Sequence, residues 1–180
     1  MALLENVCDE LGRNGVRKVL ILSGHGGNRF MIPLLVQTLL EKPRPYAAYA
    51  CVGLTVGPRG RAVLETDETG HACEYETSVA LHIHPDLVKT DRIPDRPFTG
   101  LDRAAAVREA GGYSSMDWHL MYPTMYVGDA RRATAEKGRI IQEERVAALA
   151  KLYRAIKADD VTPGVIEQHE AMARDPQPPY

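Results

Sequence analysis

The sequence contains few cysteines, few aromatic residues and no long hydrophobic run. Its three cysteines, Cys8, Cys51 and Cys73, are widely spaced and form no C-x-x-C pair. Neither a disulfide framework nor a zinc ribbon is therefore indicated, and we expect a cytoplasmic protein. The longest apolar runs are well short of the roughly 20 residues that a membrane-spanning helix needs. The start of the chain also lacks a secretory signal pattern, so we expect no membrane or export role.

Charge of one sign is not in excess either. The chain carries 22 basic and 24 acidic residues, with a formal net charge of -2. Because sequence-independent binding to a phosphate backbone needs a positive excess, nucleic acid is not expected as a partner. What is present is an ordinary globular composition, with 44% hydrophobic and 26% charged residues in 180. That composition is sufficient for one domain with its own core.

The first third of the chain alternates between helical and strand patterns. Apolar residues at helical spacing predict a helix over residues 2–13, with the stripe Leu3, Leu4, Val7 and Leu11. A buried strand follows over 17–22 and a second one over 46–56. Between them, Asn28 is predicted to cap a helix with the apolar stripe Phe30, Leu34, Leu35 and Leu39. This order indicates a parallel α/β crossover.

The rest of the chain is predicted to be mainly loops and two amphipathic helices. A loop over 57–70 precedes a helix that begins near residue 74 and stops before Pro85, and residues 91–129 look irregular. Residues 134–158 predict a long helix whose charged residues form a solvated face. We expect a single α/β domain over 1–160, followed by a proline-rich tail over 161–180 that is frayed or used in assembly.

The segment SGHGGN, residues 23–28, places His25 directly after a predicted strand. Ligands of open α/β sheets collect at the carboxyl ends of the strands, and the amides that follow open a helix. His25 is therefore a candidate functional residue. A glycine-rich turn that merely bears an exposed histidine is the plainer alternative. A phosphate-binding loop is a third, but neither G-x-G-x-x-G nor G-x-x-x-x-G-K-[ST] is present to support it.

The segment TGHACEYETS, residues 69–78, brings a second histidine close to carboxylates. His71 and Glu74 stand at a predicted loop-to-helix transition, and histidine with carboxylate suits a divalent metal or proton transfer. The alternative is a capped and solvated first helical turn, where acidic residues are favourable anyway. We interpret Glu76 in that second way, as a helix-start charge.

Aromatic residues, which make up only 6% of the chain, gather in the segment GGYSSMDWHLMYP. This segment holds Tyr113, Trp118, His119 and Tyr122. Such a loop suits a substrate lid, and an anchor buried in the core is equally compatible with the pattern.

Three motifs together resemble the creatininase family. SGHGGN resembles that family's NGHGGN, and HACEYETSVALHIHPDLV is similar to its HAGExETS...PxLV segment. VGDARRATAEKGRIIQ is similar to its GDPxxATxEKG. The three occur in the family's order between about residues 5 and 158, which is more specific than any one motif. The sequence departs from the pattern at Ser23, where the family has asparagine, and at Cys73, where it has glycine.

The resemblance implies a three-layer α/β fold with a mostly parallel sheet. It also implies a metal-dependent amidohydrolase that cleaves a cyclic or linear amide C–N bond with metal-activated water, and a homo-oligomer. By resemblance, His25 and Glu74 would bind the metal, and His71 and Glu74 would manage the proton. The metal would be zinc, manganese or iron in a two-metal centre. Residues expected to contact the small amide substrate are Gly26, Gly27, Asn28, Tyr75, Trp118 and Tyr122.

One part of the family pattern has no counterpart in this sequence. The family carries a segment of the form E-x-H-G...D upstream of GHGGN, which supplies three ligands, including a bridging aspartate. A truncated gene, a mis-assigned start or a separate N-terminal chain would each account for the difference. A catalytically incomplete remnant or subunit is therefore the alternative function. If the hydrolase interpretation is right, His25 and Glu74 should converge at one crevice.

Overall fold

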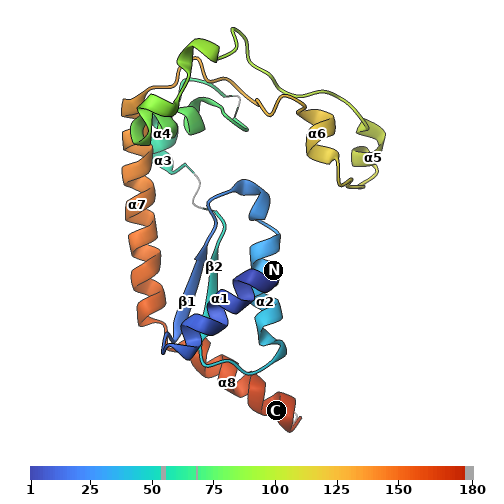
Figure 1. Cartoon of the computed structure of the whole chain (residues 1–180), viewed down its shortest axis with the longest axis vertical. Helices are drawn as coiled ribbons and strands as arrows, with labels where there is room; N and C mark the ends of the chain where they lie inside the picture. Colours follow the sequence, from blue (N-terminus) through green and yellow to red (C-terminus); the bar gives the residue numbers. More distant parts are fainter. Residues whose placement is uncertain (54–55, 68, 177–180) are drawn as a thin grey trace. The chain divides into compact units, whose positions relative to one another are not determined.

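The computed structural model describes residues 1–53, 56–67 and 69–176 (Figure 1). It divides into two compact units. Unit 1 consists of Met1–Thr55 and Ala148–Tyr180, and unit 2 consists of Val56–Ala147. The single domain expected over residues 1–160 stays a prediction.

Unit 1 is built on two parallel strands. Helix α1 (Ala2–Arg13) leads to β1 (Lys18–Leu22), and α2 (Met31–Thr38) leads to β2 (Ala47–Cys51). Two 3-10 turns, η1 (Gly26–Asn28) and η2 (Leu39–Glu41), flank α2. The strands pair in register from Lys18 opposite Ala47 to Leu22 opposite Cys51. The predicted parallel crossover is thus confirmed. Positions 54–55, near the end of the predicted second strand, lie outside the described residues.

The core of unit 1 forms where α1 and α2 meet the strands. Its buried members are Cys8, Val19, Leu35, Leu39 and Tyr46. Gly12 on α1 is the point of closest approach, because a Cβ atom there would lie 2.5 Å from the Tyr46 ring. The Tyr46 hydroxyl donates to Asp9 Oδ1 at 2.6 Å, which ties the start of β2 to the same helix.

The face of α1 that packs on the core differs from the predicted one. Cys8 and Gly12 are buried, whereas Leu3, Val7 and Leu11 are 77%, 48% and 39% exposed. Phe30, the N-cap of α2, and Leu34 within α2 are likewise exposed. On α1 the prediction was wrong because Gly12 lets the helix approach Tyr46 closely, which turns its larger side chains away from the core.

The exposed stripe of α1 bears on the expected assembly. Leu3, Val7 and Leu11 follow one another at four-residue spacing and so share one face. We expect sedimentation equilibrium to show self-association. The double variant Leu3→Asn with Leu11→Asn should weaken this association, because these leucines would no longer bury apolar surface between two copies of the chain. Leu87→Asn, a change at an exposed leucine of unit 2, is the matched control. A monomeric wild-type protein at micromolar concentration would contradict the prediction.

The predicted tail contains a regular helix, α8 (Val161–Arg174). Pro163 lies in its first turn, where a missing N–H group costs no helical hydrogen bond. Asp159 Oδ1 accepts from the backbone N–H groups of Val161 and Thr162 at 2.9 and 3.1 Å. A frayed tail was therefore the wrong expectation for residues 161–174. Residues 177–180 of the predicted tail lie outside the described part of the chain.

Unit 2 is made of helices and loops in the residues that the structure describes. Its helices are α3 (Pro58–Val63), α4 (Glu74–Ile83), α5 (Ala105–Glu109), α6 (Asp117–Met121) and the first part of α7 (Ala135–Ala158), with 3-10 turns η3 (Pro85–Leu87) and η4 (Thr90–Arg92). Helices α4 and α7 lie where the sequence predicted them. Antiparallel bridges join His71 to Val127 and Phe98 to Gly128. Residues 127–128 thus connect two distant loops.

Helices α4 and α7 touch at a glycine. A Cβ atom on Gly138 would lie 1.9 Å from the backbone oxygen of Ser78. The Ser78 hydroxyl also accepts from the Thr134 N–H at 3.1 Å. The glycine inside α7 is therefore explained by direct contact with the α4 backbone. Among the described residues, no helix combines the length and apolar character required to cross a membrane.

Candidate functional site

His25 lies in unit 1, exposed, directly after β1. It stands at the N-cap of η1, where its Nδ1 atom accepts from the Gly27 N–H at 3.1 Å. A Cβ atom on Gly27 would lie 2.9 Å from that nitrogen, so the imidazole position requires glycine there. The nitrogen left for a ligand is Nε2. Gly26, Gly27 and Asn28 form η1 itself.

The predicted capping role of Asn28 is wrong. Helix α2 begins three residues later, at Met31, and its N-cap Phe30 makes no side-chain hydrogen bond. Asn28 instead closes the 3-10 turn that follows His25. Because His25 belongs to unit 1 and Glu74 to unit 2, their convergence at one crevice stays a prediction.

His71 lies in unit 2, and its position is fixed from three directions. Its backbone exchanges hydrogen bonds with Val127 at 2.9 and 2.8 Å. Its Nδ1 atom hydrogen-bonds to the backbone oxygen of Met125. Because a carbonyl oxygen can only accept, the proton of the neutral ring must sit on Nδ1. Nε2 therefore carries the lone pair that can bind a proton or a ligand.

An aromatic pair adjoins His71 through Trp118. Trp118 meets the imidazole edge-on, with ring centroids 6.0 Å apart and planes at 79°. Tyr122 lies against Trp118, with ring centroids 4.6 Å apart. The Trp118 Nε1–H donates to Met125 Sδ at 3.2 Å. Since Trp118 remains 42% exposed, these residues form an accessible wall rather than a fully buried anchor.

Tyr75, also predicted to contact substrate, is half-buried in the first turn of α4. Burial raises the pKa of its hydroxyl, while the nearby Arg145 guanidinium lowers this pKa to a smaller extent. Arg145 lies over the Tyr75 ring at 6.0 Å from its centroid. The Tyr75 ring therefore contacts Arg145, a cation of α7.

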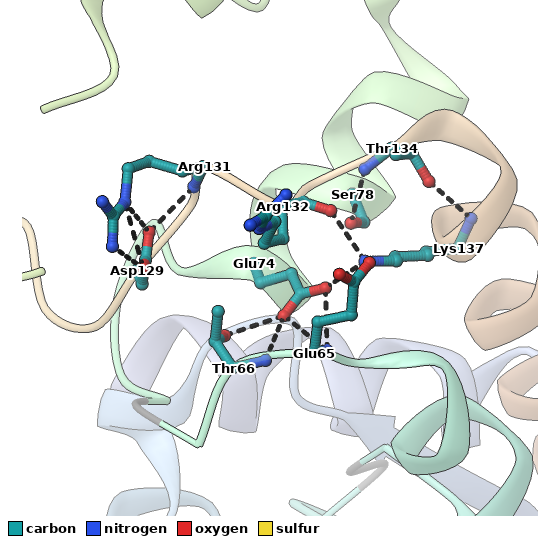
Figure 2. A network of polar contacts seen from close by, with 9 residues as sticks. All are labelled: Glu65, Thr66, Glu74, Ser78, Asp129, Arg131, Arg132, Thr134 and Lys137. Atoms are coloured by element: carbon teal, nitrogen blue, oxygen red, sulfur yellow. Dashed lines mark hydrogen bonds and ion pairs between the residues drawn. The ribbon is translucent and has the colours of Figure 1, made fainter. Parts of the chain in front are cut away.

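Glu74 is 1% exposed and lies at the centre of a polar network (Figure 2). The Glu65 N–H donates to both carboxylate oxygens, at 3.1 and 3.0 Å. Oε2 also accepts from the N–H and the hydroxyl of Thr66, at 2.8 and 2.7 Å. The Lys137 ammonium group forms an ion pair with Oε1. Lys137 in turn reaches Glu65 and the backbone oxygen of Arg132.

The charges in this network support one another. Burial alone would raise the pKa of the Glu74 carboxyl, but hydrogen bonds from Lys137, Thr66 and Glu65 outweigh it, and the pKa lies below its usual value. Burial would likewise lower the pKa of Lys137, and the carboxylates of Glu65 and Glu74 raise it instead. Glu74 and Lys137 are therefore both charged at neutral pH.

This arrangement leaves Glu74 no free position for a metal. A carboxylate offers about four lone-pair sites, and four donor groups already use them: the shared Glu65 N–H, the Thr66 N–H and hydroxyl, and the Lys137 ammonium group. In the parts of the chain that the structure describes, no group of three or more His, Cys, Asp or Glu side chains is placed to hold a metal ion.

Lys137 was predicted to lie on a solvated helix face and was not among the predicted site residues. The Lys137 side chain is only 12% exposed. Glu144, on the same predicted face, accepts from the N–H groups of Arg59 and Gly60 at 3.1 and 2.9 Å. For Lys137, the available signal was its place in the EKG triplet of the third motif.

Asp129, from the same motif, is a second buried carboxylate that the sequence analysis did not single out. Arg131 donates to both of its carboxylate oxygens and also binds the backbone oxygen of Asp95. Hydrogen bonds from Arg131 lower the pKa of Asp129 to about 2. Together with the bridges at residues 127 and 128, this pair fixes the loop that holds His71.

Comparisons with known proteins agree on one family. The family model described as creatininase, creatinine amidohydrolase, matches residues 1–153. The mycofactocin precursor peptide peptidase of Mycobacterium ulcerans (strain Agy99) is 31% identical over 129 residues, which are 72% of this chain and 45% of that protein. The peptidase of the same name from Mycolicibacterium smegmatis (strain ATCC 700084 / mc(2)155) is 28% identical over 161 residues, which are 88% of this chain and 58% of that protein.

Solved structures show the same fold. A crystal structure assigned as creatinine amidohydrolase from Bacteroides fragilis NCTC 9343 matches with a TM-score of 0.69 and 32% identity, over 89% of this chain and 62% of that one. A creatininase mutant complexed with creatine matches with a TM-score of 0.68 and 23% identity, over 88% of this chain and 64% of that one. The chain thus spans about half the length of the curated relatives and less than two thirds of these structures. On the family match over residues 1–153, this chain belongs to the creatininase family.

Proposed function

We propose that the protein hydrolyses an amide C–N bond and that His71 moves the proton between the reacting atoms. The observation that carries this proposal is the fixed tautomer of His71, whose Nδ1 atom is bound to the Met125 carbonyl. A general base needs a lone pair in a defined position, and Nε2 provides one. Family membership supports the reaction class, because the matched family model is that of an amidohydrolase.

The residues around His71 suit an amide substrate. Nε2 can take a proton from an attacking water and return it to the departing nitrogen. Trp118 and Tyr122 offer aromatic faces against which a planar amide can stack. Tyr75, Gly26, Gly27 and Asn28 remain proposed substrate contacts. The proposal also includes the three-layer, mostly parallel arrangement of the family fold, of which β1 and β2 are one pair.

The substrate class is a small cyclic amide or a peptide-derived amide. Creatine is bound in one solved creatininase, and the matched curated relatives are peptidases that act on a precursor peptide. Both ligands present a planar C–N unit, a guanidinium in creatine and an amide in a peptide, which is the part that His71 and the aromatic wall would recognise.

A divalent metal is the cofactor to test. One matched creatininase is of a Zn-Zn type, and another is a Mn form. The side chains described in this chain do not by themselves fit a two-metal centre, because the oxygens of Glu74 are already bonded and His25 offers one nitrogen. We therefore derive no step through a metal. A catalytically incomplete subunit is the alternative, and the bonded state of Glu74 favours it.

Metal content and hydrolysis together test the proposal. The purified chain is dialysed against metal-free buffer and then given Zn²⁺ or Mn²⁺. We expect it to retain well under one equivalent of metal and to hydrolyse amides slowly. Supplying in trans a segment of the E-x-H-G...D form that the family resemblance implies should raise both metal content and hydrolysis, because a water-activating site needs more ligands than the described residues show. Plasma mass spectrometry measures the metal. Ring opening of creatinine to creatine, and release of amine from N-formyl amines and short peptides, measure hydrolysis.

The outcomes separate the two functions. If the supplemented assembly holds metal but hydrolyses none of these substrates, the hydrolase proposal fails and a remnant without catalytic function stands. If the chain alone keeps two tightly bound ions and turns over an amide, the assignment of ligands to another segment is wrong. His71→Asn should abolish hydrolysis in the assembly while leaving its metal content unchanged.

A further inference from the structure

The residue after His71 has an unusual backbone conformation. Ala72 has a φ angle of +54°, in the left-handed region that disfavours residues with a Cβ atom. Met125, whose carbonyl binds the His71 ring, has a φ angle of +62°. Conformations of this kind persist only where surrounding interactions hold them, and they concentrate at functional sites. Two such residues therefore border the histidine.

Side chains from α4 hold Ala72 in this conformation. Glu76 Oε2 accepts from the Ala72 N–H at 2.6 Å. The Thr77 hydroxyl donates to the Ala72 backbone oxygen at 3.1 Å. In an ordinary capping box, the glutamate at the third helical position binds the N-cap residue. Here the N-cap is Cys73, and Glu76 reaches one residue further back, to the residue bonded to His71.

The turn at Ala72 determines how the chain leaves His71. The His71 backbone oxygen is held by the Val127 N–H at 2.8 Å, and α4 starts three residues after His71. Ala72 and the N-cap Cys73 alone must therefore redirect the chain from the bridge toward the helix, and of the two Ala72 takes the left-handed conformation. If Ala72 relaxed to a negative φ angle, the backbone bridge and the ring contact with Met125 could not both be kept.

We propose that Glu76 is a positioning residue, which fixes Ala72 in the left-handed conformation and thereby orients the His71 imidazole. Any effect of Glu76 on catalysis rests on the proposed function of His71. Glu76 forms no ion pair within the described ranges of the chain, so the bond to Ala72 is its structural contribution there. A helix-start charge alone would not need this specific geometry.

Substitutions at Glu76 and Ala72 test the proposal. Glu76→Ala should disturb the His71 ring, and adding Ala72→Gly should restore it, because glycine adopts the left-handed region without a Cβ penalty. Glu76→Gln, which keeps an oxygen acceptor, should have a smaller effect. Glu136→Ala, at an exposed glutamate in the first turn of α7, is the matched control and should have none. The primary measurement is imidazole ¹⁵N NMR of His71.

The expected result is one Nδ1–H tautomer in the wild-type protein and mixed tautomers in Glu76→Ala. Wild-type signals in Glu76→Ala, or a failure of Ala72→Gly to restore them, would overturn the proposal. If Glu76→Ala does not fold, the His71 signals of the double variant and of Glu76→Gln are compared with those of the wild-type protein instead. In the metal-supplemented assembly, we expect kcat to fall about tenfold in Glu76→Ala and to recover in the double variant. NMR changes without any hydrolysis would leave Glu76 as positioning residue and refute the hydrolase proposal alone.

Discussion

Replacing Lys137 with methionine is expected to destabilise unit 2 by about 3–5 kcal/mol. The substitution keeps much of the side-chain volume but leaves the Glu74 carboxylate, which is 1% exposed, without its cation. Removing one partner of a buried pair strands an uncompensated charge, which costs more than the pair itself contributes. Since domains are stable by only about 5–15 kcal/mol, the loss should be large in urea unfolding.

Arg139→Met is the matched control for this prediction. Arg139 lies two residues further along α7 and pairs with Glu136 and Glu143, and all three side chains are exposed. We expect its replacement to cost less than about 1 kcal/mol. Adding Glu74→Gln to Lys137→Met should recover part of the loss, because the buried charge is then removed. Equal destabilisation by Lys137→Met and Arg139→Met would refute the buried ion pair.

Gly138→Ala is the second substitution with a large expected effect. The new Cβ atom would lie 1.9 Å from the backbone oxygen and 2.5 Å from the backbone carbon of Ser78. A rotamer change cannot relieve a clash with backbone, so α4 and α7 must separate. Overpacking of this kind costs about 1–3 kcal/mol or more, and should outweigh the roughly 1 kcal/mol that alanine gains over glycine in a helix. Thermal unfolding measures the balance.

Gly164→Ala provides the opposite expectation for the same chemical change. Gly164 lies in α8, and no atom stands within 4 Å of a Cβ built there. Only the helix preference remains, so we expect a stabilisation of about 0.5–1 kcal/mol. If both alanine variants shifted the melting temperature in the same upward direction, close contact between α4 and α7 would be ruled out.

Part of the candidate site could be predicted from the sequence, because local patterns report on it. The loop-to-helix transition near Glu74 and the strand before His25 follow from apolar spacing and glycine placement. The structure has α4 beginning at Glu74 and β1 ending at Leu22. The roles of these residues in metal binding and catalysis stay predictions. Aromatic clustering also drew attention to Trp118 and Tyr122, which the structure places together beside His71.

Partners distant in sequence were not predictable in the same way. The carbonyl that fixes His71 belongs to Met125, 54 residues away, and the cation of Glu74 belongs to Lys137, 63 residues away. Apart from its place in the EKG triplet of the third motif, nothing in the local pattern distinguishes Lys137 from a solvated helix lysine. Its burial arises from the contact of α4 with α7, and therefore from Gly138 and Ser78 rather than from its own segment.

Local sequence patterns are enough to predict the main elements. Helices α1, α4 and α7 and strand β1 lie where periodicity, glycine and proline predicted them, because each pattern acts within one or two turns of its own residues. Tertiary structure alone decided which faces are buried and which polar groups meet. It turned Leu3, Val7 and Leu11 of α1 outward and left Glu74 with Lys137 and two backbone amides as partners. The physical reason is that burial and ion pairing depend on which segments pack together, and a local pattern carries little information about its distant neighbours.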